Sequence, residues 1–190
     1  MTTDLRALVV FADPSLHRSR TSRRVADAVA GLPGVLVRDL YQLYPDFYID
    51  VRRERELLKA APLLLFVFHL DWYAMPALLK EWFDSVFKPD WAERQPRRLA
   101  GKRAFAAVSC PGGALDYRPG GAHGRPLEDY LAPLAQSASV CGMEWLAPQV
   151  FHEADAQGGS AADGHADALR VRLARLAALD IDTQGGRNGT

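Results

Sequence analysis

The sequence predicts a doubly wound α/β domain, in which helices cover both faces of a five-stranded parallel sheet with strand order 2-1-3-4-5. Three observations support this architecture. Apolar runs alternate with amphipathic segments, the run Leu63–Phe68 shows no polar alternation, and about 180 ordered residues are too few for an eight-stranded α/β barrel. Right-handed crossovers would then bring the carboxyl ends of strands one, three and four to one crevice.

Strands are expected where apolar residues run together, and helices where they recur every three or four positions. The expected strands are Ala7–Ala12, Val35–Asp39 toward the sheet edge, Leu63–Phe68, Arg103–Ser109 and Trp145–Phe151. The expected helices are Ser19–Ala30, Val51–Ala60, Pro76 to Phe87, Leu127–Ser139 and Asp163–Leu179. Residues 1–179 are therefore interpreted as one domain, and the glycine-rich residues 180–190 as a flexible tail.

Composition narrows the functional classes. The 23 basic residues balance the 23 acidic ones, so the overall charge gives no reason to expect nucleic acid or an anionic membrane as partner. Cys110 and Cys141 stand outside any metal-spaced cluster. No metal site is expected, and both are interpreted as buried thiols of a reducing compartment. Because neither a signal peptide nor an apolar stretch of roughly 18 residues is present, a cytoplasmic protein is expected.

Aromatic residues follow the third expected strand. The turn between this strand and the helix that starts near Pro76 contains His69, Leu70, Asp71, Trp72 and Tyr73. Such turns bind ligands in open α/β sheets. The sequence therefore predicts that Trp72 and Tyr73 line a ligand site; the alternative is that they plug the end of the core.

The segment DPSLHRSRTSRR, residues 13–24, leads into the first expected helix. Ser19, Thr21 and Ser22 offer hydroxyl and amide groups at a helix N-terminus, where a phosphate is favoured. Four arginines are expected to add positive charge nearby, namely Arg18, Arg20, Arg23 and Arg24. ATP hydrolysis is not expected, because the chain has no GxxxxGK[ST] motif. The alternative is an ordinary serine cap beside a solvated basic face.

The segment SCPGGALDYRPGGAHG, residues 109–124, follows the fourth expected strand. Gly112 and Gly113 would let the backbone approach a flat ligand closely, because they carry no side chain. Tyr117 and His123 are the two groups able to donate hydrogen bonds or protons into the crevice. The alternative for His123 is that it is merely exposed.

With these segments the chain resembles the flavodoxin-like NAD(P)H:quinone oxidoreductases, and within them the ancillary proteins of glutathione-regulated potassium efflux systems. The resemblance covers about residues 5–152. It rests on DLYQLYPDFYID at 39–50, WYAMPALLKEWFDSVF at 72–87 and CGMEWLAP at 141–148. It implies a flavodoxin-like fold, bound FMN (with FAD possible), and a two-electron ping-pong transfer from NADH or NADPH to a quinone.

Site residues follow from the resemblance by position. The phosphate loop falls on Asp13, Ser19, Arg20, Thr21 and Ser22, and the flavin-ring loop on Leu70, Asp71, Trp72 and Tyr73. The third flavin loop falls on Ser109, Cys110, Pro111 and Gly112, next to Gly113. The catalytic pair falls on Tyr117 and His123, whose donated hydrogen bonds would stabilise negative charge on the reduced flavin.

The resemblance also implies partners. A homodimer is expected, with active sites at the subunit interface. Two alternatives to a quinone reductase are an ancillary subunit of a potassium/proton antiporter, peripheral to the inner face of the cell membrane, and a diverged reductase acting on another small molecule.

The chain departs from the family pattern at several positions. Asp13 stands where the family usually has His, Ser22 replaces Asn, and Pro111 replaces Gly. The Glu93-Arg94 pair stands where Tyr-Gly is common, and Asp71 where relatives often carry an amide. Carboxylates at positions 13 and 71 would repel a phosphate and an anionic reduced flavin unless they pair or turn away, and Arg20 could compensate Asp13.

Overall fold

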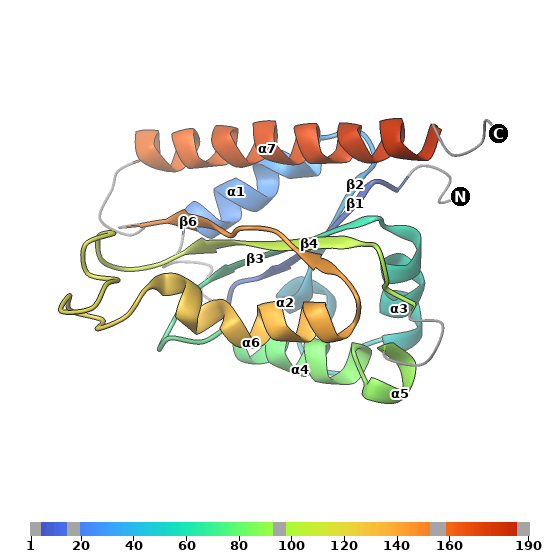
Figure 1. The fold of residues 1–190 in the computed structure, drawn as a ribbon, viewed down its shortest axis with the longest axis horizontal. Coiled ribbons are helices and arrows are strands. Elements are labelled where there is room, and N and C mark those ends of the chain that lie inside the picture. Colours follow the sequence, from blue (N-terminus) through green and yellow to red (C-terminus); the bar gives the residue numbers. More distant parts are fainter. Residues whose placement is uncertain (1–4, 15–19, 93–97, 153–158, 186–190) are drawn as a thin grey trace.

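A parallel sheet lies between two layers of helices in the computed structural model, which describes residues 5–14, 20–92, 98–152 and 159–185 (Figure 1). The elements are, in chain order, β1 (Ala7–Ala12), α1 (Arg20–Ala30), β2 (Val35–Asp39), α2 (Leu40–Leu43), α3 (Val51–Ala60), β3 (Leu63–His69), α4 (Ala77–Val86), α5 (Pro89–Ala92), β4 (Arg103–Ser109), α6 (Leu127–Val140), β5 (Glu144–Trp145), β6 (Gln149–Phe151) and α7 (Gly159–Gly185).

The sheet has the predicted order β2-β1-β3-β4-β5, and all of its pairs are parallel. The flavodoxin-like α/β fold is therefore confirmed. β1, β3 and β4 form its centre and are almost entirely buried, as expected for unbroken apolar runs. β2 is half-buried, in agreement with its predicted place at the edge.

Alternating residues of the central strands face two separate cores. Val9, Phe11, Leu65 and Phe105 pack on the face covered by α1 and α7. The opposite face packs against the layer that contains α2, α3, α4 and α6, and its centre is Trp82 with Phe66 and Phe83. Helices therefore cover both faces, as predicted (Figure 1). Among the helices of the described segments, none is both long and apolar enough to cross a bilayer.

The prediction of one continuous fifth strand at Trp145–Phe151 is wrong. The structure has two short strands, β5 and β6, and both pair with β4. Pro148 lies between them and has no backbone N–H to donate, which explains why the ladder is interrupted there. The last helix also differs from its prediction, because it begins at Gly159 and continues beyond Leu179 to Gly185.

A buried carboxylate connects α3 to β2 and α4. The Glu54 side chain is fully buried, and its Oε1 accepts hydrogen bonds from the Arg38 guanidinium at 2.6 and 3.0 Å and from the Tyr44 hydroxyl at 2.7 Å. Its Oε2 accepts from Trp82 Nε1 at 3.1 Å. Burial, followed by the hydrogen bond to Glu54, raises the pKa of Tyr44 to about 12. The network therefore keeps Tyr44 neutral and ties the edge strand to the central helix layer.

Candidate functional site

The carboxyl ends of β3 and β4 lie side by side and position the loops that follow them. His69 pairs with Ser109 in the parallel register, and the Leu70 amide donates to the Ser109 carbonyl at 2.8 Å. Asp13 follows β1 at the same edge and is buried. Burial of Tyr41 raises the pKa of its hydroxyl, and the nearby Asp13 carboxylate raises it further. The structure therefore brings the starts of the three loops together at one edge of the sheet.

A chain of polar side chains connects these loops. The Ser22 and Ser109 hydroxyls lie 2.7 Å apart, and Ser109 Oγ lies 3.0 Å from His69 Nδ1. Both serines are about 1% exposed. Sequence reasoning placed His69 in the turn after the third strand but gave it no role at the site, whereas the structure makes it the last residue of β3. The signal that could have identified it is an imidazole at the end of an apolar strand, opposite a serine in a parallel register.

The first turn of α1 provides the predicted polar groups only in part. Thr21 and Ser22 are buried at the helix start, where unsatisfied backbone amides favour an anion. Arg20 begins the helix. Ser19 and Arg18 lie outside the described residues, as do Glu93 and Arg94 of the expected family departures.

Two of the four arginines expected near a phosphate form ion pairs with carboxylates. Arg23 forms an ion pair with Asp39 at 2.8 Å, and its guanidinium lies over the Phe11 ring. Arg24 forms an ion pair with Asp163 of α7 at 2.7 Å. Sequence spacing could not show these pairs, because their acidic partners belong to β2 and α7. A carboxylate therefore balances part of the charge of Arg23 and of Arg24, and their contribution to a phosphate site stays a prediction.

The loop after β3 exposes its aromatic side chains. Trp72 is 87% exposed and Tyr73 46%, so the alternative that they plug the core is wrong. Both have left-handed backbone conformations, with φ of 48° and 62°, which are uncommon for large side chains. Leu70 points into the core and is 2% exposed, whereas Asp71 is exposed. Leu70 would thus meet a ligand only through its backbone.

An aromatic cluster joins this loop to the third loop. The Tyr73 hydroxyl lies 3.3 Å from His123 Nδ1, and the His123 and Tyr117 ring centroids are 4.2 Å apart. Tyr130 of α6 stacks on Tyr73 at 5.0 Å and donates its hydroxyl to the His123 carbonyl at 2.7 Å. Tyr117 and His123, predicted as a pair, are therefore in contact. Sequence reasoning missed Tyr130, because nothing in the sequence distinguishes it from any other aromatic residue of a helix.

Tyr117 and Cys110 are held in their neutral forms. The Tyr117 hydroxyl donates to the Pro111 carbonyl at 2.9 Å. Burial raises the pKa of the Tyr117 hydroxyl, and the neighbouring Cys110 raises it further. Burial also raises the pKa of the Cys110 thiol to about 11, and its Sγ lies 3.5 Å from His152 Nδ1. At neutral pH both groups are therefore potential hydrogen-bond donors rather than anions.

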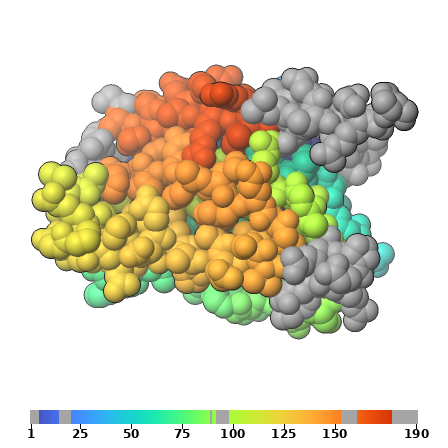
Figure 2. All heavy atoms as spheres, viewed as in Figure 1, coloured from blue at the N-terminus to red at the C-terminus, as the bar shows by residue number. Residues whose placement is uncertain are grey.

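The backbone of the third loop is fixed by glycines. Gly112 has a φ of 75°, and a Cβ there would lie 3.1 Å from His123 Nε2. Gly113 donates its N–H to the Asp116 carboxylate at 2.7 Å. A Cβ on Gly121 would come within 2.5 Å of the Asp116 carbonyl. The loop packs its own backbone closely and projects at one end of the molecule, as the yellow residues show in Figure 2.

The described residues fit a flavin in three respects. Thr21 and Ser22 provide polar groups at a helix start for a phosphate. The exposed rings of Trp72 and Tyr73 provide flat apolar surface for a ring system, and Gly112 keeps the space beside His123 Nε2 free of a side chain. One feature opposes binding, namely the buried Asp13 carboxylate near the phosphate end.

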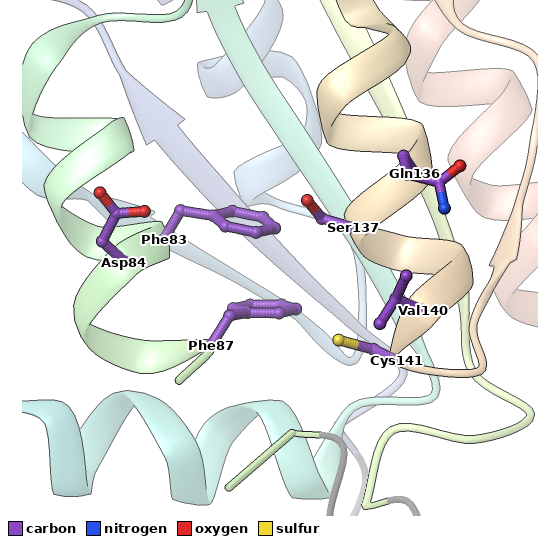
Figure 3. A pocket seen from close by; sticks show the side chains of 7 residues that line it. All are labelled: Phe83, Asp84, Phe87, Gln136, Ser137, Val140 and Cys141. Carbon is purple, nitrogen blue, oxygen red and sulfur yellow. The ribbon is translucent and has the colours of Figure 1, made fainter. Parts of the chain in front are cut away.

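A separate hollow of about 380 Å³ lies between the last turns of α4 and α6, away from the first turns that adjoin the loops described above (Figure 3). Phe83 and Phe87 stack at 4.3 Å along one side, and Cys141, which follows the last residue of α6, faces them. Among the described residues that line it, Asp84 is the one acidic side chain and none is basic. This hollow lacks the convergent polar groups of the loop site and is not the candidate functional site.

The chain is similar to known proteins in both sequence and fold. Residues 6–176 match the family described as having the flavodoxin-like fold. Over 146 residues the chain is 38% identical to the glutathione-regulated potassium-efflux system ancillary protein KefF of Enterobacter sp. (strain 638), covering 76% of this chain and 82% of that protein.

Three solved structures are similar throughout their length. General stress protein 14 of Treponema denticola, solved in complex with FMN, is 31% identical, with a TM-score of 0.80 over 92% of this chain and 99% of its own. A chain described as a thermophilic tryptophan halogenase of Streptomycin violaceusniger is 35% identical, with a TM-score of 0.82 over 86% and 95%. The NADPH-quinone reductase of P. pentosaceus, at 24% identity and a TM-score of 0.79 over 88% and 97%, shows the fold alone.

Proposed function

Because this chain belongs to the flavodoxin-like family, in the group of NAD(P)H:quinone oxidoreductases and potassium-efflux ancillary proteins, we propose that it binds FMN and transfers two electrons from NADH or NADPH to a quinone. The observation that carries this proposal is the cluster of Tyr73, Tyr117 and His123 beside a glycine-lined loop. The FMN complex of the Treponema denticola relative supports the choice of cofactor.

The proposed cofactor contacts come from three loops. Asp13 and residues 19–22 would adjoin the phosphate. Leu70, Asp71, Trp72 and Tyr73 would hold the ring from one side, with Ser109, Cys110, Pro111, Gly112 and Gly113 along its edge. A bound flavin would supply the two-electron redox chemistry of the proposed ping-pong cycle between NAD(P)H and the quinone.

The side chains around that ring would have separate tasks. His123 would donate a hydrogen bond to negative charge that develops during the transfer. Tyr117 would hold the loop through its hydrogen bond to the Pro111 carbonyl, and its ring would hold the His123 ring in place by packing against it. Trp72 and Tyr73 would exclude water from the reacting face.

Ligand removal and restoration test the proposal. The purified protein is expected to be yellow, with flavin absorbance in the visible range, and the released flavin is expected to be FMN rather than FAD. Stripped protein should regain quinone-dependent NAD(P)H oxidation when FMN is added, above the rate of free FMN with the same reagents. A colourless protein that neither FMN nor FAD activates would overturn the proposed function.

A regulatory function is the second candidate, and the 38% identity to a potassium-efflux ancillary protein specifically favours it. In this case the chain would dock on the cytoplasmic side of a potassium/proton antiporter. Potassium efflux should then depend on this chain, and the chain should co-purify with the antiporter's cytoplasmic domain. Unchanged efflux after deletion of the chain would argue against this function.

A homodimer is proposed for either function. Large apolar side chains are exposed in the loops of the candidate site, among them Trp72 at 87% and Leu115 at 69%. Such surface is commonly covered by a second subunit. Light scattering should give twice the chain mass of 20.9 kDa, and the mass of one chain at micromolar concentration would refute the dimer.

A further inference from the structure

One side chain at the candidate site has no assigned task, namely the imidazole of His69. It ends β3, immediately before the loop that carries Leu70 and Trp72. The parallel register places it opposite Ser109, the last residue of β4. Since neighbouring parallel strands hold in-register residues on the same face, the imidazole and the Ser109 hydroxyl are brought together by the sheet itself.

The Ser109 hydroxyl extends this contact to α1. Its oxygen lies 3.0 Å from His69 Nδ1 and 2.7 Å from the Ser22 hydroxyl, both within hydrogen-bond range. Ser22 and Ser109 are each about 1% exposed, so their contact is sheltered from water. A hydroxyl both donates and accepts, and Ser109 therefore transmits the orientation of one neighbour to the other.

The two ends of this polar chain are the two ends of the proposed cofactor site. Ser22 belongs to the first turn of α1, where a phosphate would bind. His69 directly precedes the ring loop. The first residue of that loop is fixed to β4, because the Leu70 amide donates to the Ser109 carbonyl at 2.8 Å. Ser109 thus holds α1 with its side chain and the ring loop with its backbone.

We propose that His69 is a positioning residue that couples the ring loop to the phosphate end of α1 through Ser109 and Ser22, and thereby favours phosphorylated flavin over riboflavin. The inference rests on the proposed function, because it assumes that flavin is the ligand. His69 then acts from the end of β3, and a change at the ring end alters recognition of the phosphate.

Binding of FMN and riboflavin, followed by fluorescence quenching on stripped protein, tests the coupling. His69→Ala should weaken FMN binding about fivefold, the effect of one typical hydrogen bond, and leave riboflavin binding nearly unchanged. Ser22→Ala should produce the same selective loss, and the double variant should lose little more than either single one. His69→Asn should restore part of the preference, because its amide places a polar atom near the position of Nδ1.

Ser137→Ala is the matched control, since its hydroxyl donates to the Pro133 carbonyl within α6, away from the polar chain. It should change neither affinity. Equal weakening of both flavins by His69→Ala would overturn the proposal, because a merely structural histidine would act on the ring and the phosphate alike. Additive losses in the double variant would also overturn it.

A measurement without flavin separates this inference from the proposed function. The nitrogen chemical shifts of the His69 imidazole should change in Ser22→Ala and stay constant in Ser137→Ala, as measured by NMR of the flavin-free protein. A wild-type protein that binds neither flavin overturns the proposed function, and the imidazole shifts then decide the coupling alone. An imidazole unaffected by Ser22→Ala overturns the coupling whatever the flavin results.

Discussion

Glu54→Ala is expected to lower the free energy of unfolding by about 3–5 kcal/mol, the usual cost of removing one partner from a buried ion pair. Glu54 is fully buried and faces Arg38, whose side chain is 15% exposed, at 2.6 Å. Burial alone would lower the pKa of the Arg38 guanidinium, but its hydrogen bond and attraction to Glu54 raise it above the ordinary value. The pair therefore depends on the carboxylate.

The truncation would remove more than one charge contact. Tyr44 and Trp82 also donate to the Glu54 carboxylate, so their buried polar atoms would lose an acceptor together with Arg38. The side chain also fills space beside the central helix layer, and a small residue would leave a cavity there. These losses act in the same direction on the folded state.

Urea denaturation measures the effect, with the slope m checked for constancy. Glu54→Gln should fall between wild type and Glu54→Ala, because it keeps the shape and part of the hydrogen bonding but not the charge. Glu56→Ala is the matched control on the same helix, since Glu56 pairs with Lys59 at the surface. If Glu54→Ala unfolds at the same urea concentration as Glu56→Ala, the network does not stabilise the fold.

The sequence predicts the fold correctly wherever the apolar pattern by itself determines the structure. β1 and β4 have their predicted bounds, because an unbroken apolar run has one favourable place, the centre of a covered sheet. The short helix α2 was not predicted, since its four residues carry no periodicity. It depends instead on the Asp39 side chain, which accepts from the Gln42 amide at its start.

The candidate site could be predicted only as a set of loops. Parallel topology brings those loops to one edge of the sheet, so their residue numbers follow from strand ends. Contacts between side chains do not, because Ser22 and Ser109 lie 87 positions apart and Tyr73 and His123 lie 50 apart. The salt bridge of Arg24 to α7, at a separation of 139, is equally invisible to local pattern.

His123→Gln is expected to slow the reduction of bound flavin by NAD(P)H by about 10²-fold, typical of losing one donor that stabilises developing charge. Tyr117→Phe should have a smaller effect, since its hydroxyl donates to the Pro111 carbonyl rather than to a ligand. The double variant should resemble His123→Gln, because the Tyr117 ring, which packs against residue 123, remains in place. Bound FMN should stay near the wild-type amount in all three.

Stopped-flow loss of the visible flavin absorbance, with NADPH in excess, measures that step apart from quinone reduction. Tyr48→Phe removes a hydroxyl from an exposed tyrosine of the α2–α3 connection and serves as the matched control. His123 also contacts Tyr73 and Tyr117 of the aromatic cluster. Slower flavin reduction with an unchanged amount of bound FMN would therefore mean that the imidazole acts on the reaction and not on cofactor retention. If His123→Gln reduces fully bound FMN at the wild-type rate, this residue has no catalytic role. If Tyr48→Phe slows flavin reduction as much as His123→Gln does, the effect is not specific to the aromatic cluster.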